Sequence, residues 1–206
     1  MSAWDDEAPP AAGVVLEAGR GSLPFRLIPG ESLGAASAGA AGEAGIELVD
    51  ATAPLAAVAE RGEVLVVHDA LCPMTPPAFL AACAARSADD DVVVVGVRAV
   101  TDTVKLLAPA RGEADGPVLG ATVDRDALVA VWSPVVVPPD VLADLAASAG
   151  DGPTLPALDL AELTAALRAR YGAERVVLVD APPEARRVGG LDDIELLEAL
   201  TRPGDG

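Results

Sequence analysis

The chain has 206 residues, which suggests one domain, or one domain plus an appendage, and is long enough to bury a substantial apolar core. Its 32 acidic and 14 basic residues give a net charge of −18, and this balance argues against a nucleic-acid or anionic-membrane partner, because both need positive surface. The two cysteines are too few for a disulfide framework, and the acidic start does not resemble a signal peptide. No apolar run reaches the roughly 18 residues of a membrane span. We therefore expect a cytoplasmic protein.

The pattern along the chain predicts one domain over residues 12–201, between a disordered acidic tail at 1–11 and a flexible C-terminus at 202–206. Strands are expected, in chain order, at 13–19, 24–33 (with a loop), 46–51, 63–69, 91–100, 127–139 (interrupted by Pro134) and 175–181. Helices are expected at 34–45, 52–60, 76–87, 140–149, 159–172 and 191–200, and residues 151–158 read as a loop.

The strands at 63–69 and 91–100 lack polar alternation, which indicates that both of their faces are covered. Such strands alternating with helices are typical of an α/β fold with a Rossmann-like, doubly wound, mainly parallel sheet. Residues 101–107 and 117–125, with a charged loop between them, predict a projecting two-stranded arm at about 101–125.

The stretch EVLVVHDALCPMTPP (63–77) ends an apolar run in the only histidine, His68, followed by Asp69. In doubly wound sheets, ligands bind at the carboxyl ends of the strands. Asp69 is therefore expected at the edge where ligand chemistry occurs, although a plain strand end with a turn aspartate explains the same residues.

Five segments occur in the order VVLEAGRGS, VVHDALCP, TDTVK, TVDR and ARRVGGLDD. Their order and spacing resemble the 2-C-methyl-D-erythritol 4-phosphate cytidylyltransferase family, most closely over residues 63–135. The resemblance implies a nucleotidyltransferase that transfers a cytidylyl group from CTP to a polyol phosphate of isoprenoid biosynthesis. It also implies Mg²⁺ as cofactor and a homodimer whose arms complete each other's acceptor sites.

The resemblance implies a role for each matching residue. Asp69 is the magnesium-linked catalytic aspartate, Glu184 stands near the place of a second acid, and Arg187 takes the place of a catalytic lysine. Gly19 and Gly21 are the nucleotide-binding glycines. Thr103 and Arg125 on the arm bind the acceptor phosphate.

The chain departs from the family pattern at several cations. The loop arginine is replaced by Ser22 or Leu23, the Pro-Lys pair by Pro29-Gly30 and the arginine after the aspartate by Cys72. The only lysine, Lys105, lies on the arm. This pattern predicts a degenerate active site with few cations for the triphosphate, into which Arg20 or Arg26 could swing.

Structural alternatives stand beside these roles. The GRGS segment could be a hairpin turn between residues 14–18 and 24–28, and Thr103 and Arg125 could only hold the arm to a partner. Cys72 and Cys83 read as buried small apolar residues, and Asp159 with Glu162 reads as a capping box. Glu184 could be an ordinary loop acid.

Two functions therefore follow from the sequence. One is a divergent cytidylyltransferase with impaired or lost turnover. The alternative is a catalytically inactive homologue that binds a phosphorylated metabolite or pairs with another subunit.

Overall fold

The structure is a computed structural model that describes residues 9–28, 30–108, 118–149 and 159–201. The predicted flexible C-terminus, the loop at 151–158 and most of the predicted tail lie outside these residues. The tail prediction extends one residue too far, because Ala11 is already buried in the first strand.

The regular elements follow the predicted order, with the differences described below. The strands are β1 (Ala11–Leu16), β2 (Leu27–Ile28), β3 (Glu31–Ser32), β4 (Glu47–Leu48), β5 (Val64–Asp69), β6 (Val93–Ala99), β7 (Val104–Ala108), β8 (Val118–Val123), β9 (Val129–Val137) and β10 (Val176–Asp180). The α-helices are α1 (Leu33–Glu43), α2 (Leu55–Ala59), α3 (Pro77–Asp90), α4 (Pro139–Ala149), α5 (Leu160–Tyr171) and α6 (Leu191–Thr201). Single 3₁₀ turns form η1 (Leu23–Phe25), η2 (Arg125–Ala127) and η3 (Pro183–Ala185).

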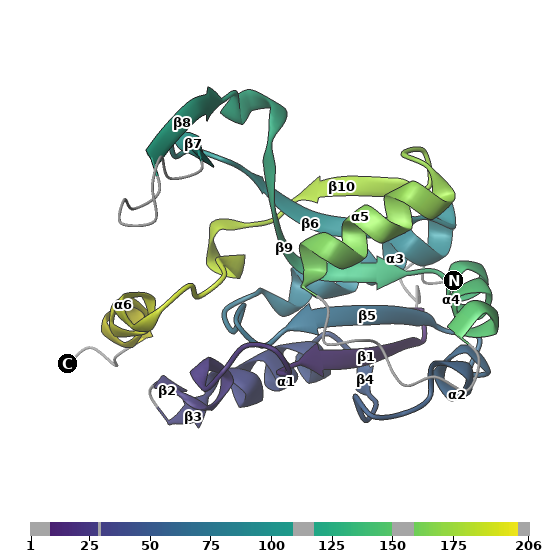
Figure 1. Ribbon diagram of the computed structural model, residues 1–206. Helices are drawn as coiled ribbons and strands as arrows, with labels where there is room; N and C mark the ends of the chain where they lie inside the picture. Colours follow the sequence, from purple (N-terminus) through teal and green to yellow (C-terminus); the bar gives the residue numbers. More distant parts are fainter. Residues whose placement is uncertain (1–8, 29, 109–117, 150–158, 202–206) are drawn as a thin grey trace, which may run out of the picture.

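Within the described residues, six strands form one sheet in the order β10-β6-β9-β5-β1-β4 (Figure 1). The sheet is mainly parallel, as predicted, and β9 alone runs antiparallel to its neighbours β5 and β6. β1 and β5 pair in a register that sets Leu16 opposite Asp69. The glycine loop that follows β1 therefore starts beside Asp69.

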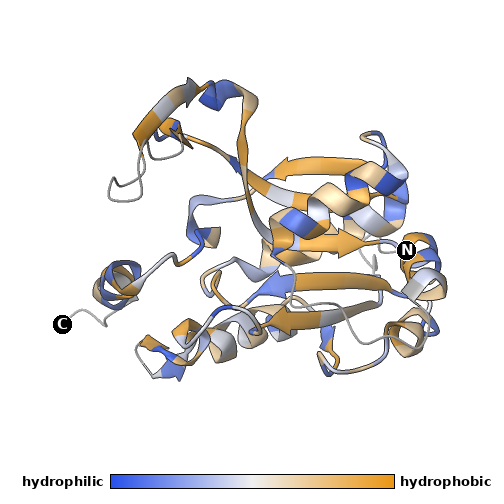
Figure 2. Ribbon diagram, viewed as in Figure 1, coloured by the Kyte–Doolittle hydropathy of each residue, from blue (hydrophilic) through white to orange (hydrophobic). Residues whose placement is uncertain are grey.

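Apolar side chains alternate between the two faces of the sheet, which explains why its strands read as continuous apolar runs. Leu65 and Val67 belong to the core cluster that includes residues of α2, α4 and α5. Val64 and Val66 belong to the cluster on the opposite side, with residues of α1 and α3. The apolar strands are thus covered on both faces, and Figure 2 shows the apolar colour of the central strands.

Helix α5 is the clearest case of agreement between the sequence pattern and the structure. Asp159 is its N-cap and accepts a hydrogen bond from the Ala161 N–H, at 2.7 Å. Leu160, Leu163 and Leu167 are buried on one face. The N-cap is confirmed, and the reciprocal side-chain bond of a capping box is absent from the described contacts of Glu162.

Pro134 does not interrupt its strand, contrary to the prediction. β9 is continuous through Pro134, and the β6–β9 ladder shifts register between Val95 and Val97 instead. A proline lacks an N–H for the ladder, so the strands accommodate it at an irregularity. Gly96 lies at that point, and a Cβ added to it would stand only 2.6 Å from the Ser133 carbonyl oxygen.

We expect Gly96→Ala to lower the free energy of unfolding by about 1–3 kcal/mol, because the new methyl group overlaps backbone atoms in the centre of the sheet. Urea unfolding followed by circular dichroism measures the change. The matched control is Gly39→Ala on the exposed face of α1, where a Cβ meets nothing within 4 Å. This control should gain roughly 0.5–1 kcal/mol from helix propensity. Equal effects of the two changes would contradict the proposed overlap.

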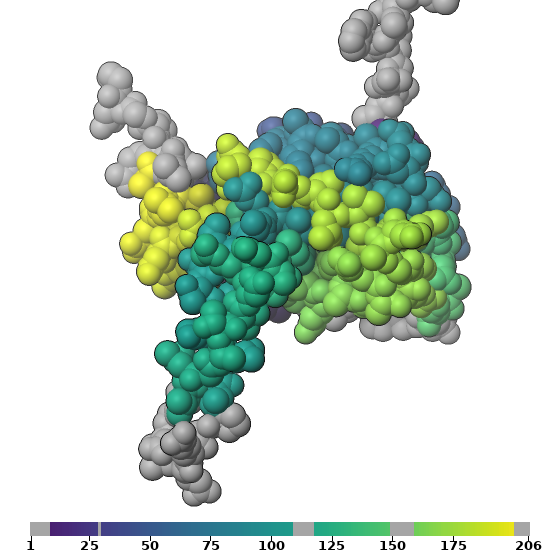
Figure 3. Space-filling model, turned by 90° about the horizontal axis from the view of Figure 1, so that it is seen from above, coloured from purple at the N-terminus to yellow at the C-terminus, as the bar shows by residue number. Residues whose placement is uncertain are grey.

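The predicted arm is an antiparallel ribbon of β7 and β8 that projects from the body of the molecule (Figures 1 and 3). The residues between the two strands, 109–117, lie outside the described part. Several apolar side chains of the ribbon are exposed, and Leu107 and Leu119, which pair across it, are 69% and 72% exposed.

Helix α6 stands apart from the sheet and is held by a small apolar cluster of its own (Figure 1). Ile194 of this helix packs with Ile28, Leu33, Leu71 and Val188. The backbone N–H of Val188 donates to the Leu71 carbonyl, at 2.7 Å. The cluster therefore fixes the segment before α6 against the loop that follows β5.

Candidate active site

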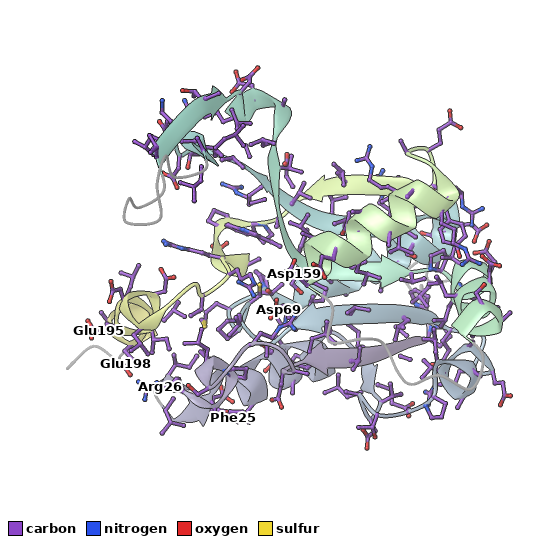
Figure 4. The ribbon with its side chains drawn as sticks, in the orientation of Figure 1. Phe25, Arg26, Asp69, Asp159, Glu195 and Glu198 are labelled. Atoms are coloured by element: carbon purple, nitrogen blue, oxygen red, sulfur yellow. The ribbon has the colours of Figure 1, made fainter. Side chains whose placement is uncertain are left out.

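Asp69 ends β5 at the carboxyl edge of the sheet, as predicted, and its side chain is almost completely buried, with 2% exposed (Figure 4). Two arginine side chains contact its carboxylate. Arg20 comes from the loop after β1 and Arg187 from the segment after η3. Three segments that are distant in sequence thus meet at one carboxylate.

The contacts of the Asp69 carboxylate are well defined. Arg20 donates from Nε to Oδ1, at 2.8 Å, and from Nη2 to Oδ2, at 3.2 Å. Arg187 donates from Nε to Oδ2, at 3.1 Å, and the Leu71 N–H donates to Oδ1, at 2.9 Å. The Arg20 Nη1 also donates to the Ala18 carbonyl, at 2.6 Å, which fixes this guanidinium in its own loop.

These contacts decide the ionisation of Asp69. Burial alone would raise the pKa of the carboxyl group, but the hydrogen bonds from Arg20 and Leu71 and the charges of Arg20 and Arg187 outweigh burial. The pKa of Asp69 therefore lies below its ordinary value, and the residue is an anion between two cations at neutral pH.

His68 lies beneath Asp69 in the core, where burial lowers its pKa to about 4. Its Nδ1 is hydrogen-bonded to the Ser133 Oγ of β9, and the Asp69 N–H donates to the same oxygen, at 3.1 Å. The His68 Nε2 has no hydrogen-bond partner among the described residues. A neutral imidazole therefore connects β5 to β9 directly below the site.

The loop after β1 carries the predicted nucleotide-binding glycines. Gly19 and Gly21 have φ angles of 77° and 60°, which favour glycine, and both are exposed. Neither of their N–H groups donates a hydrogen bond to the described residues. These two donors flank Arg20 and are free to bind an anion.

The interpretation of GRGS as a hairpin turn is wrong. β1 pairs with β4 and β5, and β2 pairs with β3, so residues 24–28 do not return along β1. The chain instead forms η1 after the glycines. The physical reason is that both edges of β1 are already occupied by parallel neighbours.

Beside Arg187 lies a cavity of about 350 Å³ between the loop after β5, η3 and α6. Apolar side chains of Met74, Val188 and Leu196 line it together with Arg187 and Glu184. A second hollow lies between η1 and α6, where Phe25 and Arg26 face Glu195 and Glu198 (Figure 4).

The other predicted residues fall into two places. Thr103 lies just before β7 and Arg125 just after β8, where the Arg125 Nη1 donates to the Thr101 carbonyl, and both residues are exposed. No contact within the described residues joins either of them to Asp69. Glu184 is exposed on η3, and its side chain forms no hydrogen bond or ion pair with the described residues.

The predicted magnesium ligands do not fit a metal ion as they are arranged. Both oxygens of Asp69 accept two hydrogen bonds each, and Glu184 does not contact this carboxylate. Among the described residues, no three His, Cys, Asp or Glu side chains gather as a metal-ligand group. Mg²⁺ needs oxygen ligands with free lone pairs at about 2.1 Å.

Sequence reasoning undervalued Arg20 and missed Ser133. An arginine between two glycines, directly after a strand that neighbours β5, was the available signal for Arg20. No local signal marks Ser133, which reaches His68 and Asp69 across the β5–β9 ladder. Cys72 and Cys83 are buried, as predicted.

A mainly parallel sheet, a glycine loop after the first strand, a carboxylate at the end of β5 and a projecting arm define an α/β domain of the nucleotidyltransferase class. The family model for 2-C-methyl-D-erythritol 4-phosphate cytidylyltransferase matches residues 43–202. The chain therefore belongs to this family, which confirms the resemblance seen in the sequence.

Individual relatives agree with this assignment. A bifunctional enzyme IspD/IspF from Anaeromyxobacter sp. (strain Fw109-5) is 34% identical over 194 residues, which cover 92% of this chain and 46% of that protein. A 2-C-methyl-D-erythritol 4-phosphate cytidylyltransferase from Frankia casuarinae is 40% identical over 99 residues, which cover 48% of this chain and 35% of the relative. The matched region is thus less than half the length of these curated relatives.

A solved structure of the same family has a similar fold. The crystal structure of 2-C-methyl-D-erythritol 4-phosphate cytidylyltransferase from Thermus thermophilus is 25% identical and has a TM-score of 0.63. The match covers 93% of this chain and 98% of that chain. The predicted α/β fold class is therefore confirmed.

Proposed function

We propose that this chain transfers a cytidylyl group from CTP to 2-C-methyl-D-erythritol 4-phosphate or a similar polyol phosphate of isoprenoid biosynthesis. Family membership supports the reaction class. The observation that carries the proposal is the meeting of the glycine loop, Arg20 and Arg187 at the carboxyl end of β5. In this reaction an acceptor phosphate oxygen bonds to the α-phosphorus of CTP, and the bond to the leaving pyrophosphate breaks.

The residues present suit the charges that this reaction creates. Negative charge grows on the α-phosphate oxygens and on pyrophosphate, and catalysis of such transfers rests on positioning and electrostatic stabilisation. In our proposal, the N–H groups of Gly19 and Gly21 bind the nucleotide phosphates. Arg187 stabilises the developing charge, with Asp69 holding its guanidinium in place. Because both oxygens of Asp69 are already hydrogen-bonded, we assign no step to the predicted magnesium ion.

We expect Arg187→Ala to lower kcat/KM for pyrophosphate release from CTP and 2-C-methyl-D-erythritol 4-phosphate by on the order of 10²–10³-fold, the usual effect of losing one oriented donor. The fold should persist, because Arg20 still pairs with Asp69. The matched control is Arg86→Ala, which removes an exposed arginine of α3 paired with Asp90. Unchanged turnover in Arg187→Ala would contradict the role of this residue.

The arm supports the predicted homodimer. We propose that the exposed apolar ribbon packs on a second copy of the chain and that Thr103 and Arg125 contribute to the partner's acceptor-phosphate site. Arg125 is held against the segment that contains Thr103 by its bond to the Thr101 carbonyl. No described contact joins them to Asp69 of the same chain, which agrees with a role in a second subunit.

Leu107→Glu with Leu119→Glu should shift the protein from dimer to monomer, because the two charges would be buried in a subunit interface. Sedimentation velocity measures the change. The control is Leu48→Glu on β4, an apolar residue that is 40% exposed but lies away from the arm. A double variant that keeps the wild-type mass would exclude the arm as the dimer contact.

The alternative function is an inactive homologue that binds a phosphorylated metabolite or pairs with another subunit. The occupied carboxylate of Asp69 favours it, because this residue is not free to take part in the chemistry as arranged. Thermal melting separates the two proposals, since a ligand at 100 times its Kd adds about 2.7 kcal/mol of stability. Stabilisation by the polyol phosphate but not by CTP, together with no turnover, would select the inactive homologue.

Other predicted properties stay proposals. The absence of nucleic-acid partners agrees with the acidic balance of the chain, and a cytoplasmic location agrees with its two cysteines. Among the helices of the described residues, none combines the length and the apolarity that crossing a membrane requires.

A further inference from the structure

The four hydrogen-bond positions of the Asp69 carboxylate are all filled by nitrogen donors. A carboxylate has about four lone-pair sites, and Arg20, Arg187 and the Leu71 N–H occupy two on each oxygen. Arg20 is itself 7% exposed and is tied to the Ala18 carbonyl. A metal ion can reach Asp69 only after one of these donors leaves.

The charge at this point is nevertheless positive without a metal ion. The Asp69 carboxylate with the guanidinium groups of Arg20 and Arg187 has a net charge of +1, whereas Mg²⁺ in place of Arg20 would give +2. The guanidinium groups are fixed by side-chain and backbone contacts, so their charge is present before any ligand binds.

We infer that Arg20 replaces the divalent cation at Asp69 in this chain, and that phosphoryl groups bind beside it without a metal ion bound by the protein. The second half of this inference rests on the proposed function. Arg20 and Arg187 supply the positive charge, Asp69 positions both guanidinium groups, and Asp69 is a positioning residue rather than a metal ligand.

Donors remain for an incoming anion. A guanidinium has five N–H donors, and only the Nε of Arg187 is engaged in a described contact. The side chain of Arg187 is 33% exposed and lines the cavity of about 350 Å³. Its Nη groups, together with the free N–H groups of Gly19 and Gly21, are the donors that we assign to a phosphoryl ligand.

The predicted second ligand does not restore a metal site. Glu184 lines the same cavity, but it is exposed and does not contact Asp69. A divalent ion bound between the two acids would therefore have to break the buried contact of Arg20. Because a buried arginine that loses its carboxylate partner is strongly destabilising, we expect the metal-bound state to be disfavoured by roughly a hundredfold or more.

Mn²⁺ titration followed by electron paramagnetic resonance tests the first half of the inference. At about 150 mM salt, which screens the acidic surface, the wild type should bind Mn²⁺ no better than Asp69→Asn. Arg20→Ala should gain binding at least tenfold tighter, because two acceptor positions of Asp69 become free, and Arg20→Ala with Asp69→Asn should lose this gain. Arg26→Ala, which removes an exposed arginine of the same region, is the matched control.

Wild-type Mn²⁺ binding that Asp69→Asn abolishes would overturn the inference. If Arg20→Ala does not fold, the wild type and Asp69→Asn still decide it: equal weak binding supports the inference, and a difference contradicts it. Because no nucleotide is present, this result is independent of whether the chain catalyses the proposed transfer.

Thermal melting with inorganic pyrophosphate tests the second half. We expect a rise in Tm in the presence of EDTA that Mg²⁺ does not enlarge and that Arg187→Ala removes. A rise that requires Mg²⁺, or no rise under either condition, would contradict metal-free binding of phosphoryl groups. Turnover with CTP is scored separately, so a failed transfer assay leaves the anion result intact.

Discussion

Asp69→Asn is expected to lower the free energy of unfolding by about 3–5 kcal/mol, because the change leaves buried Arg20 without its counter-charge. The amide also offers one acceptor oxygen where the carboxylate offers two. Three segments lose their common contact, so the effect is structural even if the chain has no catalytic activity. Urea unfolding at pH 7.5, followed by tryptophan fluorescence, measures the change.

The matched control for this prediction is Asp140→Asn. Asp140 pairs with Arg175, at 2.6 Å, but the Asp140 side chain is exposed and that of Arg175 is partly exposed, and solvent-accessible pairs contribute about 0–1 kcal/mol. If Asp69→Asn costs no more than Asp140→Asn, the buried pair has no special role in stability. In the double variant, Arg20→Ala should make the loss of stability caused by Asp69→Asn smaller. If this loss is as large with Arg20→Ala as without it, Arg20 and Asp69 contribute independently.

Periodicity was sufficient to predict the layers of the fold. The apolar runs at 63–69 and 91–100 correspond to β5 and β6, and the repeat of leucines after Asp159 corresponds to α5. These features are local, since burial on both faces of a strand or on one face of a helix determines which nearby residues in the sequence are apolar.

A local pattern of this kind could not predict the direction of β9 or the accommodation of Pro134 within the strand. An apolar run reads the same in either direction, so nothing in residues 127–139 indicates that β9 is antiparallel. Pro134 is tolerated because Gly96 leaves room opposite it, and Gly96 is distant in sequence. Both outcomes depend on pairing between strands rather than on local preference.

The charge of the site was predicted only in part. Matching to family motifs selected Asp69 and Arg187 as site residues. It compared cations position by position, and it therefore predicted that the site has few cations. The structure brings Arg20 to Asp69 across 49 residues of sequence, from a place that the motif leaves unspecified. A motif records which residue stands at a position, whereas charge at a site depends on every side chain that can reach it.

Stability should fall as the pH is lowered from about 6.5 to 4, by roughly 3 kcal/mol in total, because of His68. The folded state keeps this imidazole neutral down to its pKa of about 4, since burial opposes its charge and Nε2 has no partner to receive a second N–H bond. The unfolded chain takes up the proton near pH 6.5. Between these values the unfolded state binds more protons, so unfolding becomes easier as the pH falls.

His68 is the only histidine of the chain, so its titration can be followed without overlap. Its imidazole resonances should not shift between pH 8 and 5 in the folded protein. Asp69 acts at lower pH, because its pKa is below the ordinary value and its ion pairs are lost only when the carboxylate is protonated. His68→Asn should therefore flatten the stability profile between pH 6.5 and 4 and leave the steeper loss below pH 4. An imidazole that titrates near pH 6.5 in the folded state would mean that solvent reaches β5 beneath Asp69, and the buried ion pair could then no longer be treated as shielded from water.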